Sequence, residues 1–386
     1  MDGCAKLDKP AYLVLEDGSV HQGIGFGAEV DGIGEVVFNT SMTGYQEVLT
    51  DPSYAGQLVT LTYPLVGNYG INPQDFESSK IQVGGFIVRE ACEDPSHGRS
   101  NQSLHEFLAS QGIPGISEVD TRAITRRLRS QGVMLGAITG GTPGSALKRL
   151  QDSPAYGDRD YVATVTTGEE YDWNPDDEEL PEVKHRIVVT DCGLKYNILR
   201  QLRKRGCGVT VMPSATTAEQ LLAMKPSGIL LSPGPGDPKL LDYVVDNTRQ
   251  VLGRVPVMGI CLGHQIIARS LGAETFKLKF GHRGGNHPVK DLSDGRVYIT
   301  AQNHGYAVSS EKLPSGLEVS HINLNDQTVE GFRHKDLPLF TIQYHSEASP
   351  GPKDNEYLFD QFIEMIEDFS VCSCFATETI CFFGQK

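Results

Sequence analysis

The stretch VPVMGICLGHQIIARSLG, residues 255–272, carries the strongest structural signal in the sequence. Its apolar start predicts a buried strand that runs directly into Gly259-Ile260-Cys261-Leu262-Gly263, and the residues that follow predict a helix. Glycines two positions either side of a central residue permit the strained strand-to-helix turn called a nucleophile elbow, which presents the middle side chain. The middle residue here is Cys261, whose thiol would face the N-terminus of the helix, where thiolate is favoured. The alternative interpretation is a structural cysteine buried at a glycine-rich turn.

A cysteine nucleophile needs a base, and His345 is the best placed of the 11 histidines. It ends the predicted strand LPLFTIQYH, residues 337–345, and Glu347 follows two positions later. In an extended chain, residues i and i+2 point to the same side, so the carboxylate can accept a hydrogen bond from the imidazole and fix its tautomer. The pattern therefore predicts a catalytic triad of Cys261, His345 and Glu347.

The remaining histidines and the cysteines predict no metal site. His264 lies in the elbow helix, where we expect it to pack or to cap rather than to act as a base. His282 and His287, in FGHRGGNHPV, have no metal-like partners in view along the sequence. The eight cysteines form no zinc-type CxxC pair and no compact disulfide framework. We expect a reducing, cytoplasmic location.

A second loop is predicted to reach the same edge of the sheet. In GILLSPGPGDP, residues 228–238, an apolar strand opens into a loop that contains Gly234 and Gly236. Open α/β sheets bind ligands at the carboxyl ends of their strands, so the N–H of Gly234 or Gly236 could meet a developing oxyanion together with the N–H of Leu262. Gln265, four residues after the cysteine, would share its helix face and could bind a polar substrate group. Taken alone, the loop could also be an ordinary proline-rich turn.

The chain predicts two domains of the α/β class. Short alternating runs in the first 150 residues indicate strands, and Asp120 and Gly132 bound a predicted helix. The acidic segment 168–186 is interpreted as a linker. Strands and helices then alternate up to residue 272, which predicts a mainly parallel sheet. We assign residues 1–167 to a smaller β/α domain, 187–370 to the second domain and 371–386 to a tail that shows neither helix nor strand pattern and is interpreted as disordered.

Composition excludes several function classes. Thirty-four Lys and Arg stand against 49 Asp and Glu in 386 residues, which gives a net charge of −15. Nucleic acid is an unfavourable partner for such a chain. No apolar run is long enough to span a bilayer, so no membrane association is expected. The basic helix with Arg122, Arg126, Arg127 and Arg129 is either a solvated face or a subunit contact.

GICLGHQ, the PGPG loop and HSE together resemble the class I, triad-type glutamine amidotransferases over residues 187–368. The segments VFNTSMTGYQEVLTDPSYAGQLVTLTYPLVGNYG, ISEVDTRAITRRLR and GHRGGNHPV resemble the small-subunit family of carbamoyl phosphate synthetase, which extends the likeness to 10–368. The resemblance implies a flavodoxin-like C-terminal domain, with Cys261 as nucleophile, His345 as base and Glu347 as its orienting group. It implies an L-glutamine site formed by Ser41, Gly234, Gly236, Leu262, Gln265, Asn303, Gly305 and Tyr306.

The resemblance also implies a partner. Ammonia released from glutamine would pass to a large synthetase subunit that uses ATP, Mg²⁺ and bicarbonate, for pyrimidine or arginine synthesis. No cofactor is expected in this chain, because it has no G-x-x-x-x-G-K-[ST] motif for a nucleotide. Two alternatives stay open: a stand-alone cysteine hydrolase of γ-glutamyl compounds, and a regulatory subunit with an inactive site.

Overall fold

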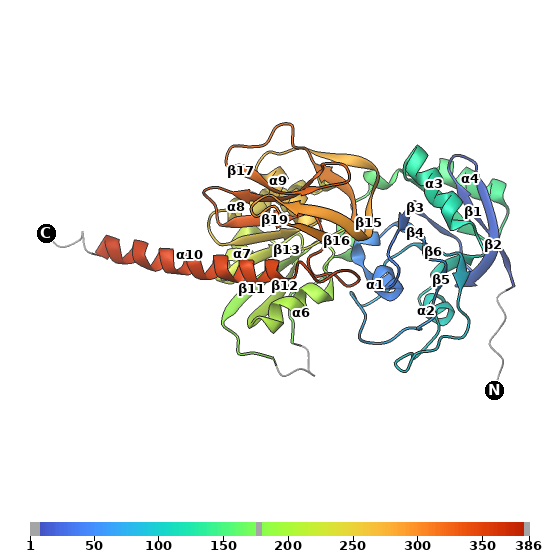
Figure 1. Cartoon of the computed structure of the whole chain (residues 1–386), viewed down its shortest axis with the longest axis horizontal. Helices are drawn as coiled ribbons and strands as arrows, with labels where there is room; N and C mark the ends of the chain where they lie inside the picture. Colours follow the sequence, from blue (N-terminus) through green and yellow to red (C-terminus); the bar gives the residue numbers. More distant parts are fainter. Residues whose placement is uncertain (1–7, 175–179, 382–386) are drawn as a thin grey trace.

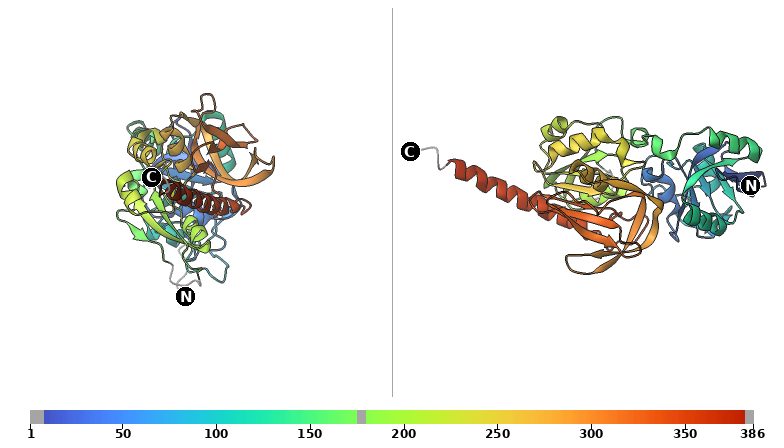
Figure 2. Two further views of the ribbon diagram at one scale, coloured as in Figure 1. Left: turned by 90° about the vertical axis from the view of Figure 1, so that its left-hand side faces the viewer. Right: turned by 90° about the horizontal axis from the view of Figure 1, so that it is seen from above.

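The computed structural model describes residues 8–174 and 180–381, the last ten of them by their backbone alone. Two domains lie side by side, and a long C-terminal helix projects from the second (Figures 1 and 2). This arrangement agrees with the α/β class predicted from the sequence.

The N-terminal domain is a closed barrel of seven strands. Their order around the barrel is β1 (Pro10–Leu15), β2 (Val20–Gly27), β8 (Pro114–Ser117), β6 (Gly85–Ile87), β4 (Gln57–Leu61), β3 (Gly32–Asn39) and β9 (Met134–Thr139). A short parallel pair, β5 (Leu65–Val66) and β7 (Glu90–Ala91), lies outside it. The domain's α-helices are α1 (Tyr45–Thr50), α2 (Leu104–Ser110), α3 (Thr121–Gln131), α4 (Pro143–Gln151) and the single turn α5 (Val162–Val165), with 3-10 turns η1 (Pro52–Tyr54) and η2 (Tyr156–Asp158).

The second domain is built on one ten-stranded sheet. Its order is β10 (Tyr171–Asp172), β12 (Cys207–Pro213), β11 (His185–Asp191), β13 (Gly228–Leu231), β14 (Val257–Ile260), β19 (Leu339–Ile342), β18 (Val329–His334), β17 (Leu317–Asn323), β15 (Thr275–Asp291) and β16 (Val297–Val308). The pairs from β12 to β19 are parallel, and all the others are antiparallel. The sheet is therefore mixed rather than mainly parallel, because the strands after residue 272 follow one another without crossover helices. β10 falls within the segment interpreted as a linker.

Both faces of the parallel half are covered by helices, as parallel sheets require. Successive strand residues alternate between the faces: Ile187 and Val189 pack toward α6 (Tyr196–Lys204) and the start of α10 (Tyr357–Cys381), where Phe359 is fully buried. Val188 packs toward the other face, which is covered by α7 (Ala218–Ala223), α8 (Asp242–Val251) and α9 (Leu262–Ser270). The predicted strand-to-helix passage is the connection from β14 to α9, at the centre of this sheet.

Helix α10 corrects the interpretation of the tail. It continues through Cys381 and leaves the body of the domain (Figure 2), so residues 371–381 are helical rather than disordered. Residues 371–381 contain no Gly or Pro to end the helix that packs on the sheet. Residues 382–386 of the predicted tail lie outside the described residues. Within the described residues, no helix is long and apolar enough to cross a membrane.

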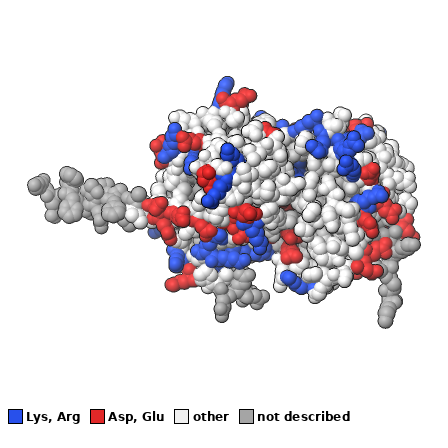
Figure 3. Space-filling model, viewed as in Figure 1, with Lys and Arg blue, Asp and Glu red and all other residues white. Residues whose placement is uncertain are grey.

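Helix α3 forms as predicted, with Asp120 as its N-cap and Gly132 at its C-cap. Its four arginines are exposed, and Lys and Arg side chains gather over this part of the barrel (Figure 3). Arg127 pairs with Asp17, and the Arg129 guanidinium lies 5.8 Å from the Phe280 ring centroid. The basic face of α3 is thus solvated and partly paired within the chain.

The turn between β14 and α9 requires its two glycines. A Cβ on Gly263 would lie 2.2 Å from the carbonyl oxygen of Leu231, and one on Gly259 would lie 2.6 Å from Cδ1 of Ile267. The N–H of Gly263 donates to the carbonyl of Ser232 at 3.1 Å, which ties the helix start to the neighbouring strand connection. The backbone of α9 can approach the sheet this closely only without side chains at these positions.

We therefore predict that Gly263→Ala lowers the free energy of unfolding by about 1–3 kcal/mol, since the methyl group would overlap backbone that cannot rotate away. Urea denaturation followed by circular dichroism measures the change. Gly168→Ala is the matched control, because a Cβ there meets no atom within 4 Å. Equal unfolding midpoints for the two variants would show that the close approach is not a constraint.

Candidate active site

Cys261 occupies a strained position between strand and helix. Its φ is 53° and its ψ is −104°, in the half of conformational space that non-glycine residues rarely adopt. The backbone is held there by a 2.8 Å hydrogen bond from the N–H of Cys261 to the carbonyl of Ile342 on β19. The thiol is buried and donates weakly to the carbonyl of Asn303 at 3.6 Å. This is the elbow geometry that the sequence predicts.

His345 and Glu347 lie together beside the thiol. Nδ1 of His345 donates to Oε1 of Glu347 at 2.6 Å, and both side chains are buried. Strand β19 ends at Ile342, three residues earlier than predicted, and His345 is fixed instead by a 2.9 Å bond from its N–H to the carbonyl of Ala301. Nε2 of His345 has no hydrogen-bond partner within the described residues. It is the ring nitrogen that the hydrogen bond to Glu347 leaves free.

Electrostatics favour a charged pair at this position. Burial opposes protonation of His345, but the charges of Glu347 and Cys261 outweigh burial and raise its pKa to about 10. Burial also opposes ionisation of Glu347, yet Lys195 and His345 lower its pKa to about 2.

His264 differs from His345, because burial lowers its pKa to about 3. Its Nδ1 lies 2.8 Å from Oγ1 of Thr341, and its ring stacks on Phe332. His264 therefore packs in the core, as the sequence analysis expected.

Lys195 is the charged residue that the sequence analysis missed. It follows β11, is 2% exposed and places Nζ 3.1 Å from Oε1 of Glu347 and 2.7 Å from the carbonyl of Ala348. Nearby Glu347, Glu77 and Asp51 raise the pKa of Lys195 against the effect of burial, so the lysine stays charged. Its position at the carboxyl end of a parallel strand is the only signal the sequence offered, since a lone lysine is usually a surface residue.

Leu262 and Gly234 line the cavity beside Cys261. The N–H of Leu262 is the first in α9, where no preceding carbonyl of the helix can accept it. Gly234 packs against the same residue, because a Cβ on it would lie 2.7 Å from Cδ2 of Leu262. The N–H of Gly236, by contrast, donates to the hydroxyl of Tyr156 at 3.2 Å. Of the two loop glycines considered from the sequence, Gly236 therefore has its N–H engaged within the chain.

A cavity beside Cys261 collects most of the predicted substrate residues. It is lined by Gly234, Gly236, Cys261, Leu262, Gln265, Asn303, Gly305 and Tyr306. Both N–H bonds of the Gln265 amide are used, toward the carbonyl of Tyr306 at 2.8 Å and Oε1 of Gln343 at 3.0 Å. The carbonyl oxygen of Gln265 is therefore the atom left to contact a ligand.

The N-terminal domain closes this cavity with residues that the sequence did not indicate. Glu35, Ser53, Gln57 and Tyr156 line it. Asp51 binds across the domain boundary, since its Oδ2 accepts a 2.8 Å hydrogen bond from Nδ2 of Asn303.

Ser41 lies apart from the cysteine cavity. It lines an adjoining cavity together with Asp51, Lys195, Asn303 and His345. Its N–H donates to Oδ1 of Asn39 at 2.7 Å, and the residue is half-buried. The structure thus brings Ser41 to the histidine side of the site, with Asn303 shared between the two cavities.

Comparison with known proteins gives two family matches and closely similar relatives. Residues 13–138 match the family described as carbamoyl-phosphate synthase small chain, CPSase domain, and residues 188–365 match glutamine amidotransferase class-I. The carbamoyl phosphate synthase small chain of Akkermansia muciniphila is 53% identical over 361 residues, which cover 92% of this chain and 97% of the relative. The pyrimidine-specific small chain of Bacillus subtilis is 52% identical over 357 residues, covering 92% of this chain and 95% of that one.

The buried lysine gives the first prediction from this geometry. Lys195→Met leaves Glu347 and Glu77 with one cation fewer in a buried site, so we expect unfolding free energy to fall by about 3–5 kcal/mol. Urea denaturation at neutral pH measures it, with the exposed Lys184→Met as control. A variant as stable as the control would mean that Lys195 does not compensate the buried carboxylates.

The second prediction concerns the titration of His345. In Glu347→Gln the carboxylate that favours the imidazolium is gone while burial remains, so the pKa of His345 should fall from about 10 toward or below its ordinary value of 6.5. A raised pKa stabilises the folded protein fully below about 6.5, and this stabilisation is lost as pH rises to about 10. NMR titration of the His345 ring in both proteins tests this, and an unchanged pKa would contradict it.

Proposed function

The chain belongs to the carbamoyl phosphate synthase small-chain family and contains a class I glutamine amidotransferase domain, and we propose that Cys261 hydrolyses L-glutamine to supply ammonia to a large partner subunit. One observation supports the assignment above all: a buried Cys261 on a strained elbow beside the hydrogen-bonded pair of His345 and Glu347. This is the arrangement that an activated thiol nucleophile needs.

The reaction begins with attack of the Cys261 sulfur on the side-chain amide carbon of glutamine. A C–S bond forms and the amide oxygen becomes an oxyanion. The His345 imidazolium then donates its Nε2 proton to the amide nitrogen, the C–N bond breaks, and ammonia leaves from a γ-glutamyl thioester. His345 next accepts a proton from water, whose oxygen attacks the thioester. The C–S bond breaks, which restores the thiolate–imidazolium pair, and the new carboxyl group releases its second proton to solvent and leaves as glutamate.

The backbone supplies the stabilisation of the oxyanion in this proposal. The N–H of Leu262 and that of Gly234 are the donors, because the N–H of Gly236 already binds Tyr156. Glu347 keeps the imidazole in the tautomer that directs Nε2 toward sulfur, and Lys195 keeps Glu347 ionised. Neither of these two residues exchanges a proton with the substrate.

Glutamine would lie in the cavity over α9. The carbonyl oxygen of Gln265 would accept from an N–H of the substrate, with Asn303, Gly305 and Tyr306 along the wall and Ser41 reaching in from the adjoining cavity. The space beside Cys261 is about 20 Å³, room for roughly one water molecule, so side chains that line it would rearrange when glutamine enters.

The chemistry of ammonia, the product, implies a partner subunit that receives it. Free ammonia becomes ammonium in bulk water and loses its nucleophilic lone pair, so a large synthetase subunit should receive it directly. ATP, Mg²⁺ and bicarbonate would bind to that subunit, where carbamoyl phosphate would form.

We predict that Cys261→Ser abolishes glutamine-dependent synthesis of carbamoyl phosphate and leaves the ammonia-dependent reaction of the assembled complex intact. The thiol is the nucleophile for glutamine alone, whereas the synthetase chemistry lies in the partner. Carbamoyl phosphate formed from each nitrogen source by the reconstituted complex is the measurement, with Cys92→Ser, at a half-buried cysteine away from the site, as control.

Three outcomes would contradict the proposal. Loss of both activities in Cys261→Ser would make the cysteine structural. A stand-alone hydrolase would be indicated if the isolated chain had full glutaminase activity, if a large subunit did not increase that activity, and if the large subunit did not consume the ammonia released. Absence of glutamine hydrolysis by the wild-type complex would indicate a regulatory subunit.

A further inference from the structure

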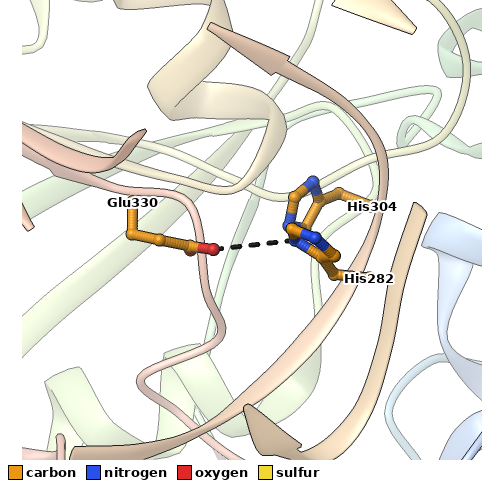
Figure 4. Close-up of side chains that lie close together, drawn as sticks. All are labelled: His282, His304 and Glu330. Atoms are coloured by element: carbon orange, nitrogen blue, oxygen red, sulfur yellow. Dashed lines mark ion pairs between the residues drawn. The ribbon is translucent and has the colours of Figure 1, made fainter. Parts of the chain in front are cut away.

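A cluster of metal-ligating side chains lies in the antiparallel half of the sheet. His282 on β15, His304 on β16 and Glu330 on β18 converge between the strands (Figure 4), and one ligand atom from each lies within 4.8 Å of the others. His282 and His304 are each 6% exposed and Glu330 is fully buried. The sequence shows no metal-like partner for His282, because only strand pairing brings the three residues together.

His282 directs its Nδ1 into this cluster. Its Nε2 lies 2.8 Å from Oδ2 of Asp326, so Nδ1 is the ring nitrogen that remains for the cluster. Nδ1 is buried, has no hydrogen-bond partner within the described residues, and lies 3.7 Å from Oε1 of Glu330. A histidine held by a carboxylate on one nitrogen and open on the other is the usual arrangement of a metal ligand.

His304 has the same arrangement from the other side. Its Nδ1 lies 2.7 Å from the carbonyl oxygen of Tyr306, which can only accept, so Nδ1 carries the proton and Nε2 the lone pair. Nε2 in turn faces Oε1 of Gln302 at 2.8 Å. Two acceptors therefore meet at hydrogen-bond distance with no hydrogen between them.

The orientation of Gln302 cannot relieve this contact. Its Nε2 donates to Oε2 of Glu330 at 3.0 Å and to Oγ1 of Thr300 at 3.1 Å, so turning the amide would set its oxygen against the carboxylate. A cation among these acceptors would satisfy all of them.

We propose that His282 Nδ1, His304 Nε2 and the Glu330 carboxylate bind a divalent transition-metal ion, with Oε1 of Gln302 as fourth ligand. Two imidazoles, a carboxylate and an amide oxygen suit Zn²⁺ in tetrahedral coordination. The charges of Glu330 and Asp326 balance those of the ion. The supporting shell is complete as well, since Asp326 and the carbonyl of Tyr306 orient the two rings and Asn323 donates to Oε1 of Glu330 at 2.8 Å.

The ion would stiffen the wall of the cysteine cavity. Asn303, whose carbonyl meets the Cys261 thiol, lies between the ligands Gln302 and His304. The carbonyl of Tyr306 accepts from both His304 and Gln265. The metal would thus fix residues 302–306 from behind and take no part in the chemistry at sulfur.

Metal binding by the Cys261→Ser chain tests the proposal, because this background removes binding at the nucleophilic thiol. After dialysis against a chelator, the protein is titrated with Zn²⁺ for stoichiometry and affinity, and with Co²⁺ for its absorption spectrum. We expect one Zn²⁺ per chain and the intense visible bands of tetrahedral Co²⁺.

Three further variants test whether Zn²⁺ binds at this cluster. Glu330→Gln should abolish the bands. Asp326→Asn, at an exposed residue outside the ligand set whose Oδ2 orients His282, should weaken Zn²⁺ binding about tenfold to a hundredfold. Glu318→Gln, an exposed carboxylate on β17, should bind as its parent does. The proposal is overturned if the parent binds no Zn²⁺, or if Asp326→Asn and Glu330→Gln both bind it as tightly as Glu318→Gln. Neither readout depends on glutaminase activity.

Discussion

The close packing of the α9 backbone on the end of β13 is the constraint on which the rest of the structure depends. Only hydrogen atoms at Gly259 and Gly263 let the helix begin so near the sheet, with a Cβ at Gly263 excluded by the Leu231 carbonyl. The chain must then turn within one residue, and Cys261 takes the resulting left-handed conformation. The thiol is therefore fixed at the helix N-terminus by backbone geometry, before any side chain of the site contributes.

Buried charged side chains fix the residues around this turn. The buried charges alternate in sign from Lys195 to Glu347 to His345, so each charge offsets the desolvation free energy of its neighbour. Two carboxylates of the N-terminal domain, those of Asp51 and Glu77, lie near the same lysine. Asp51 also binds Asn303, and Glu77 accepts hydrogen bonds from Asn197 at 3.0 Å and Ser349 at 2.8 Å. The site thus depends on both domains, and the packing between them helps to hold Glu347 and Asn303 in place.

The sequence predicted the features that are local in the chain. The elbow around Cys261, the spacing of His345 and Glu347, and the caps of α3 depend on residues within a few positions of each other. Lys195, Asp51 and the cluster of His282, His304 and Glu330 depend instead on strand order and domain packing, which no short pattern encodes. The mixed sheet and the helical course of 371–381 were missed because neither alternation nor heptad-like spacing marks them.

Trapping of the covalent intermediate tests the central claim, that Cys261 is the nucleophile, most directly. The reconstituted complex is mixed with glutamine, quenched in acid during turnover, digested and analysed by mass spectrometry. The account predicts a γ-glutamyl thioester on the peptide that contains Cys261 and on no other cysteine-containing peptide. A γ-glutamyl group on a different cysteine, or continued turnover of glutamine with no covalent adduct at any time point, would contradict it.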